Sequence, residues 1–136
     1  MSGGLCFPLY ACSREIIKRY TPFLEKIDLT YTQYIAMMVL WGKKQISVKE
    51  LGKCLFLDSG TLTPILKKLE QKGYVTRTRS EEDERVLIAA ITPKGEDLKD
   101  EAVLIPQKMM ACAALSQEKA AQLYTLLYEL LNTLEK

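Results

Sequence analysis

The chain has 136 residues, of which 48% are hydrophobic and 26% charged, values ordinary for one folded domain. It contains no histidine, which excludes His-ligated metal sites and hydrolases with a histidine base. The four cysteines form no CxxC pair, no apolar run is long enough to span a membrane, and no secretory signal pattern is present. We expect a cytoplasmic protein with reduced thiols and without a metal, a cofactor or a membrane partner.

Helical periodicity dominates the first third of the chain. Apolar residues at spacings of three and four predict a first helix from about Leu5 to Lys26. A second helix is expected to begin at Thr30 or Thr32, either of which can cap it, and to end near Gly42.

The next segment has the pattern of a helix-turn-helix. Ser47 and Glu50 match a capping box that opens a short third helix. After a turn, a fourth helix is expected to begin near Asp58 or Ser59 and to end at Gly73. Two helices joined by a short turn, with a polar outer face on the second, are typical of this motif.

A wing and a long helix are expected to follow. The β-prone segments 74–79 and 86–91, separated by a charged turn, predict a two-stranded hairpin. Thr92 caps the next helix, which is expected to run to about Ala114 with a kink at Pro106. A last helix, rich in leucine, completes the chain.

The predicted fold class is mainly α with a small β-hairpin, in a single domain over residues 1–136. A winged helix-turn-helix lobe for DNA binding covers about 31–92, and long dimerisation helices cover about 5–28 and 93–135. These terminal helices carry more large apolar residues than one small core can bury, which predicts a homodimer built from both ends. The alternative is that they cover the lobe of their own chain.

Positive charge is concentrated between residues 53 and 79, where six basic and two acidic residues give a net charge of +4, against +2 for the whole chain. Phosphate contacts around a groove-reading helix account for this distribution, so we expect double-stranded DNA as a partner. The alternative is a solvated basic face. The candidate DNA-binding residues here are Ser59, Thr61, Thr63, Lys67, Lys68, Arg77 and Arg79.

Asp83 and Arg85 at the tip of the wing complete the candidate DNA-binding set. A carboxylate two residues before an arginine can hold the guanidinium in a fixed pose for the minor groove. Glu81, Glu82 and Glu84 at the same tip repel phosphate, so a charged, solvated turn is the alternative.

Several motifs together resemble one family. DER followed by ITPKG, within 83–95, is similar to the DxR…LTxxG signature of the MarR family of winged-helix repressors. LDSGTLTP at 57–64, LCFPLYACSRE at 5–15 and LTYTQY at 29–34 resemble the organic-hydroperoxide-sensing OhrR/SarZ-like subfamily. The likeness extends over about residues 5–131.

The resemblance implies a sensor thiol. In that subfamily the cysteine of the LCF segment reacts with peroxide, and the matching residue is Cys6. Two tyrosines of the partner subunit hydrogen-bond its thiolate, and the matching positions are Tyr20 and Tyr31. The thiolate attacks the O–O bond and becomes a sulfenic acid. Without the resemblance, these side chains would be read as apolar filler and interface aromatics.

The resemblance offers two routes after the sulfenic acid. Either a small external thiol caps Cys6, or Cys112 of the other subunit resolves it as an intersubunit disulfide. The alternative for Cys112 is a small packing residue. Cys12 lies six residues after Cys6 on the first helix and faces a different side of it, so we expect no bridge between them. Cys54 is expected to lie in the core of the lobe.

The resemblance implies a redox-sensing transcriptional repressor of organic hydroperoxide resistance, not an enzyme. The reduced homodimer binds an inverted-repeat operator, and oxidation by an organic hydroperoxide, the inducer, releases the DNA. The alternatives are a MarR-type regulator that responds to a small aromatic ligand, a peroxidase and a protein-interaction module.

Overall fold

The computed structural model describes residues 4–112 and 115–135, without the side chains of 110–112. The described residues form seven helices and three strands in two compact units, Met1–Ile105 and Pro106–Lys136. No described helix combines the length and apolar character needed to cross a membrane.

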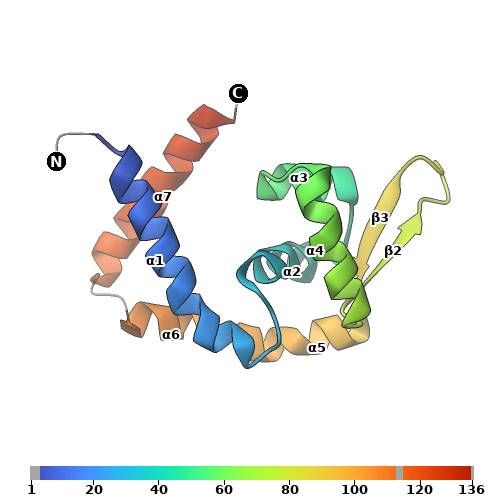
Figure 1. Cartoon of the computed structure of the whole chain (residues 1–136), viewed down its shortest axis with the longest axis horizontal. Helices are drawn as coiled ribbons and strands as arrows, with labels where there is room; N and C mark the ends of the chain where they lie inside the picture. Colours follow the sequence, from blue (N-terminus) through green and yellow to red (C-terminus); the bar gives the residue numbers. More distant parts are fainter. Residues whose placement is uncertain (1–3, 113–114, 136) are drawn as a thin grey trace. The chain divides into compact units, whose positions relative to one another are not determined.

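The first unit contains the predicted winged helix-turn-helix (Figure 1). Its elements in chain order are α1 (Cys6–Glu25), α2 (Tyr31–Lys43), β1 (Gln45–Ser47), α3 (Val48–Leu55), α4 (Ser59–Gln71), β2 (Val75–Arg79), β3 (Leu87–Ile91) and α5 (Pro93–Ala102). The helices α6 (Ile105–Cys112) and α7 (Gln117–Leu134) follow.

Side-chain caps define where most helices begin. In each case a side-chain oxygen accepts a hydrogen bond from the backbone N–H three residues later, which satisfies a donor that the first turn leaves open. The caps of α2, α3, α4, α5 and α7 are Thr30, Ser47, Asp58, Thr92 and Ser116. The expected starts of α3, α4 and α5 are therefore confirmed, and of the two candidate caps for α2 it is Thr30 that caps the helix.

The sheet has three antiparallel strands in the order β1-β3-β2, whereas the sequence predicted only the β2–β3 hairpin. In the central strand, Ala89 is opposite Ile46 of β1 on one side and Arg77 of β2 on the other. The strand that the sequence missed lies between α2 and α3, so it fastens the helix-turn-helix to the wing.

The inner face of α4 is buried in the lobe core. Leu62, Leu66 and Leu69 are almost fully covered and pack in a core that also contains Met37 and Leu40 of α2. Burying a leucine side chain contributes roughly 1.5–3 kcal/mol. Three such residues on one face hold α4 to the lobe and leave its opposite face exposed.

The helix expected between Thr92 and Ala114 is interrupted. It ends at Ala102, and a new helix begins at Ile105 after a turn at residues 103–104. An uninterrupted helix through Pro106 would lose a backbone hydrogen bond, and the proline ring would clash with the carbonyl of Ala102. The restart instead places Pro106 in a first turn, where no such bond is lost. Ala114 lies outside the described residues.

Both end helices expose large apolar side chains, as the sequence predicted. On α1 and its N-cap these are Leu5, Phe7, Leu9, Tyr10 and Ile16. Within the described residues, α7 has no buried side chain and exposes Leu123, Tyr124, Leu126, Leu127, Tyr128, Leu130 and Leu134.

Candidate nucleic-acid interface and thiol site

The outer face of α4 presents the predicted base-reading residues. Ser59 and Thr61 are exposed at its first turn, and Thr63 is half-buried. Asp58 accepts a hydrogen bond of 2.8 Å from the Thr61 N–H, and this bond holds the pKa of that carboxyl below its usual value. The first turn is thereby fixed with its short hydroxyl side chains available to a groove.

The basic residues divide into two groups. Lys67, Lys68 and Arg79 are exposed, and no ion pair in the described part of the chain includes them. Arg77, by contrast, is only 18% exposed in its side chain, and its Nη2 lies 3.0 Å from Oε1 of Glu70 at the end of α4. Arg77 therefore links β2 to α4, whereas the exposed trio stays accessible as candidate phosphate contacts.

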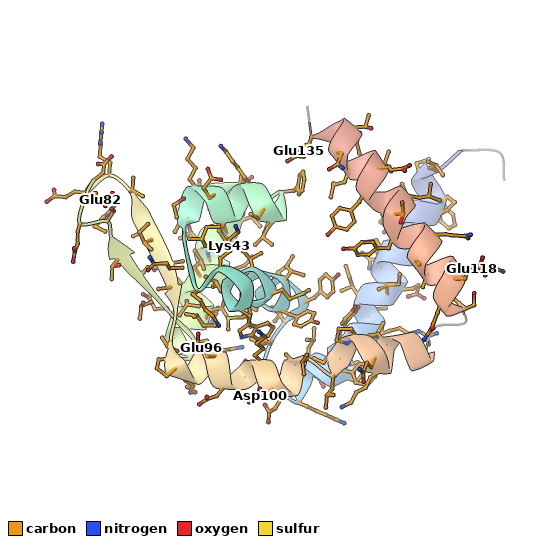
Figure 2. The ribbon with its side chains drawn as sticks, turned by 180° about the vertical axis from the view of Figure 1, so that it is seen from behind. Lys43, Glu82, Glu96, Asp100, Glu118 and Glu135 are labelled. Atoms are coloured by element: carbon orange, nitrogen blue, oxygen red, sulfur yellow. The ribbon has the colours of Figure 1, made fainter. Side chains whose placement is uncertain are left out.

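The wing tip holds a preformed arginine. The Asp83 Oδ1 accepts hydrogen bonds from the backbone N–H of Arg85 at 3.0 Å and from its Nε at 3.1 Å, while Oδ2 accepts from Nη2 at 3.4 Å. Bonding by the Arg85 side chain and then its backbone holds the pKa of Asp83 below its usual value. The Arg85 side chain remains 91% exposed. Glu82 also projects at this tip (Figure 2), so Arg85 extends from an otherwise acidic turn.

Residues 92–95 join the wing to α5 and were not recognised as a junction from the sequence. Thr92 donates to the Gly73 carbonyl at 2.6 Å and accepts from the Gly95 N–H at 3.1 Å. Trp41 Nε1 donates to the Gly95 carbonyl at 2.8 Å. A Cβ at Gly95 would overlap the Tyr74 carbonyl oxygen, so only glycine permits this close approach.

Cys6 is the first residue of α1 and is exposed. Leu5 precedes it and makes no side-chain cap hydrogen bond. Exposure favours the oxidation of a thiol, so Cys6 is placed where a dissolved oxidant can reach it.

Tyr20 and Tyr31 are brought together, with ring centroids 5.3 Å apart in an edge arrangement. Tyr34, not singled out from the sequence although it lies one turn after Tyr31, joins them at 5.9 Å from Tyr20. Burial raises the pKa of all three phenols, and Tyr31 raises that of Tyr20 further. A phenol that stays protonated is a hydrogen-bond donor.

The tyrosine pair and Cys6 of the same chain are far apart. Tyr20 lies fourteen positions after Cys6 on α1, which is about 21 Å along a helix. A hydrogen bond between these groups therefore requires a second copy of the chain.

The other cysteines differ in position. Cys12 is exposed on α1. Cys54 is also exposed, so the expectation that it lies in the core is wrong: α3 buries Leu51 and Gly52, and Cys54 points about 100° away from this face. Cys112 is the last residue of α6, and its side chain lies outside the described part.

Comparisons with known proteins agree with this geometry. A family model described as transcriptional regulator SarA/Rot matches residues 18–102. The organic hydroperoxide resistance transcriptional regulator of Bacillus subtilis strain 168 is 49% identical over 136 residues, 100% of this chain and 92% of that protein. The HTH-type transcriptional regulator SarZ of Staphylococcus aureus strain USA300 is 46% identical over 123 residues, 90% and 83% of the two chains.

Solved structures match over nearly the same extent. The structure of reduced AbfR bound to DNA has a TM-score of 0.80 and 31% identity and covers 97% of this chain and 92% of its own. The crystal structure of AbfR of Staphylococcus epidermidis has a TM-score of 0.78 and 34% identity, with the same coverage.

Proposed function

Because this chain belongs to the SarA/Rot family of winged-helix transcriptional regulators, in the MarR-type group that contains SarZ and the Bacillus organic hydroperoxide regulator, we propose that it is a redox-sensing repressor. It acts in the cytoplasm as a homodimer, binds an inverted-repeat operator when reduced, and leaves it when an organic hydroperoxide oxidises Cys6. The observation that carries the proposal is an exposed cysteine at the N-terminus of α1 in a chain that also holds a DNA-reading lobe.

The DNA-binding half rests on the exposed face of α4 and on the wing. In the major groove, Ser59, Thr61 and Thr63 contact base edges while Lys67 and Lys68 neutralise flanking phosphates. Arg79 adds a phosphate contact from the wing. Arg85, held by Asp83, enters the minor groove in a pose that costs little further ordering, because its hydrogen bonds are already made.

The homodimer rests on the apolar surfaces of α1 and α7. A folded monomer seldom exposes so much apolar surface. In a dimer with two-fold symmetry the same patches of both copies face each other, so each copy covers the apolar surface of the other. The dimer also presents two copies of α4 to successive half-sites about one DNA turn apart.

The sensing step is a two-electron oxidation at Cys6. The thiolate attacks one peroxide oxygen, the O–O bond breaks, and the alkoxide takes a proton and leaves as an alcohol. Cys6 becomes a sulfenic acid. Tyr20 and Tyr31 of the opposite protomer donate hydrogen bonds to the thiolate, and their raised pKa values keep them protonated as donors. A second thiol then condenses with the sulfenic acid and releases water, and Cys112 is the candidate within the dimer.

Fluorescence anisotropy with a labelled inverted-repeat operator tests the proposal. We expect salt-dependent binding by the reduced protein and release after one equivalent of an organic hydroperoxide per subunit. Cys12→Ser and Cys54→Ser remove the other described exposed thiols and should release normally, whereas Cys6→Ser should stay bound. Operator binding that does not change after peroxide treatment would refute the proposed sensing function. Release of the operator by oxidised Cys6→Ser would show that the sensor thiol is another residue. Mass spectrometry that finds only mixed disulfides on Cys6 would exclude Cys112 as the resolving residue.

A further inference from the structure

Lys72, at the C-terminal cap of the recognition helix α4, makes contacts that no other lysine of this helix makes. Its Nζ donates to the backbone carbonyl of Asp28 at 2.6 Å and to Oε1 of Gln33 at 2.9 Å, and lies 3.5 Å from the Asp28 carboxylate. Its side chain is only 24% exposed. The ammonium group therefore faces the α1–α2 linker and not the DNA-reading face.

The receiving side of these contacts is the linker 26–30, where α1 ends and the lobe begins. Asp28 has a φ of +56°, a left-handed conformation that presents its carbonyl to Lys72. Its neighbours Ile27 and Leu29 are buried, and Gln33 Oε1 also accepts from the Thr30 N–H at 3.1 Å. The linker is consequently fixed to the core on one side and to the end of α4 on the other.

The end of α4 is held independently of the linker. Lys94 of α5 donates to the backbone carbonyl of Lys72 at 2.9 Å, and Leu69, one turn earlier, is fully buried. The Lys72 side chain is therefore not needed to keep α4 in the lobe. What it adds is a polar tie from α4 to the linker, where a change in α1 reaches the lobe.

We propose that Lys72 is a positioning residue that couples α1 to the recognition helix, so that a change at the Cys6 end of α1 alters operator binding. This inference rests on the proposed function. The tie is short, polar and partly shielded from water. Losing it removes the Lys72 donor from the Asp28 carbonyl of the linker and leaves Gln33 Oε1 of α2 with the Thr30 N–H alone. A rotation of the last turn of α1 therefore displaces the end of α4 while the tie is intact.

Reciprocity provides a second observable. If the linker affects operator affinity, operator binding must stabilise the linker by the same free energy. Amides of residues 26–30 should therefore exchange hydrogen more slowly when the reduced protein binds DNA, although the linker is not part of the proposed interface. This readout does not involve peroxide.

The test compares Lys72→Met with Lys26→Met, which removes the same charge from the exposed C-cap of α1 without breaking the tie. The ratio of the operator Kd of the oxidised protein to that of the reduced protein should fall by about threefold to tenfold in Lys72→Met and stay unchanged in Lys26→Met. The slower hydrogen exchange of the linker on operator binding should disappear in Lys72→Met and persist in Lys26→Met. Lys72→Arg, which keeps the charge and the hydrogen-bond donors, should restore much of the Kd ratio and of the slower exchange.

Asp28→Asn tests the same tie from the linker side and leaves α4 unaltered. It therefore keeps the proposal testable even where Lys72→Met fails to fold. Asparagine tolerates the left-handed φ and the backbone carbonyl remains, so a smaller shift in the same direction is expected. The coupling role is overturned if operator binding slows hydrogen exchange in the linker of Lys72→Met as much as in wild type. It is also overturned if wild type releases DNA on oxidation and Lys72→Met has the same oxidised-to-reduced Kd ratio as wild type. If wild type ignores peroxide, the proposed function fails, and the exchange measurement alone decides the coupling.

Discussion

Gly95→Ala should strongly destabilise the winged lobe, although it adds only one methyl group. The new Cβ would overlap the Tyr74 carbonyl oxygen and lie 2.9 Å from Ile91 Cγ1. That carbonyl already accepts a hydrogen bond of 3.0 Å from the Thr92 N–H, and the Gly95 carbonyl accepts one from Trp41. The start of α5 must therefore move away from β2.

The expected cost follows from these contacts. Overpacking of this kind costs about 1–3 kcal/mol. Weakening two partly or fully buried hydrogen bonds costs about 1 kcal/mol each. The better helix propensity of alanine returns up to about 1 kcal/mol. The free energy of unfolding should thus fall by about 2–4 kcal/mol, a large share of the roughly 5–15 kcal/mol of a typical domain.

Urea unfolding monitored by tryptophan fluorescence measures this directly. Trp41 is the single tryptophan of the chain, is 7% exposed and donates to Gly95 itself. Gly42→Ala is the matched control, because a Cβ at Gly42 meets no atom and the residue lies within α2. This control should be neutral or stabilising by up to about 1 kcal/mol. A Gly95→Ala variant as stable as Gly42→Ala would refute the close-approach argument.

Two further predictions concern charge. Lys68→Ala should reduce the slope of log K against log salt for operator binding by about 1, whereas Arg77→Ala, whose guanidinium is already paired with Glu70, should leave the slope unchanged and lower stability. Equal slope changes in a salt series would contradict this assignment. Burial raises the pKa of Tyr20, Tyr31 and Tyr34 in the folded protein. These phenols therefore contribute to the free energy of unfolding at pH values below their unfolded-state pKa, and this contribution is lost as the pH rises through their folded-state pKa. Tyrosinate absorbance should show that these phenols ionise at a higher pH in the folded protein than in the unfolded chain. Identical titration curves for the folded and unfolded protein would contradict the prediction.

Local signals predicted the helices well and the sheet incompletely. A cap such as Asp58 acts on a backbone group three residues away, so a short window of sequence contains the whole interaction. The strand β1 has three residues and only one, Ile46, that is strongly apolar, too few to show an alternating pattern. It exists because β3, more than forty residues later, offers it a partner.

The candidate site shows the same division. Exposed residues of α4, such as Ser59 and Lys68, were identified correctly as surface groups because the buried leucines on the opposite face define the helix period. Arg77 and Lys72 were counted with the basic surface, but the Arg77 guanidinium is paired with Glu70 of α4 and the Lys72 ammonium donates to the Asp28 carbonyl of the linker. Counting charges along a chain does not show which are neutralised by distant segments.

The strand order has a consequence for solubility as well as for recognition. Because β3 pairs on both sides, the free backbone edges of the sheet belong to β1, which is very short, and to β2. A long bare edge invites pairing with other chains, and charged side chains are a common protection. On β2 the exposed Arg79 stands at this edge. The arginine that we propose for a phosphate contact thus also discourages β-mediated aggregation through this edge.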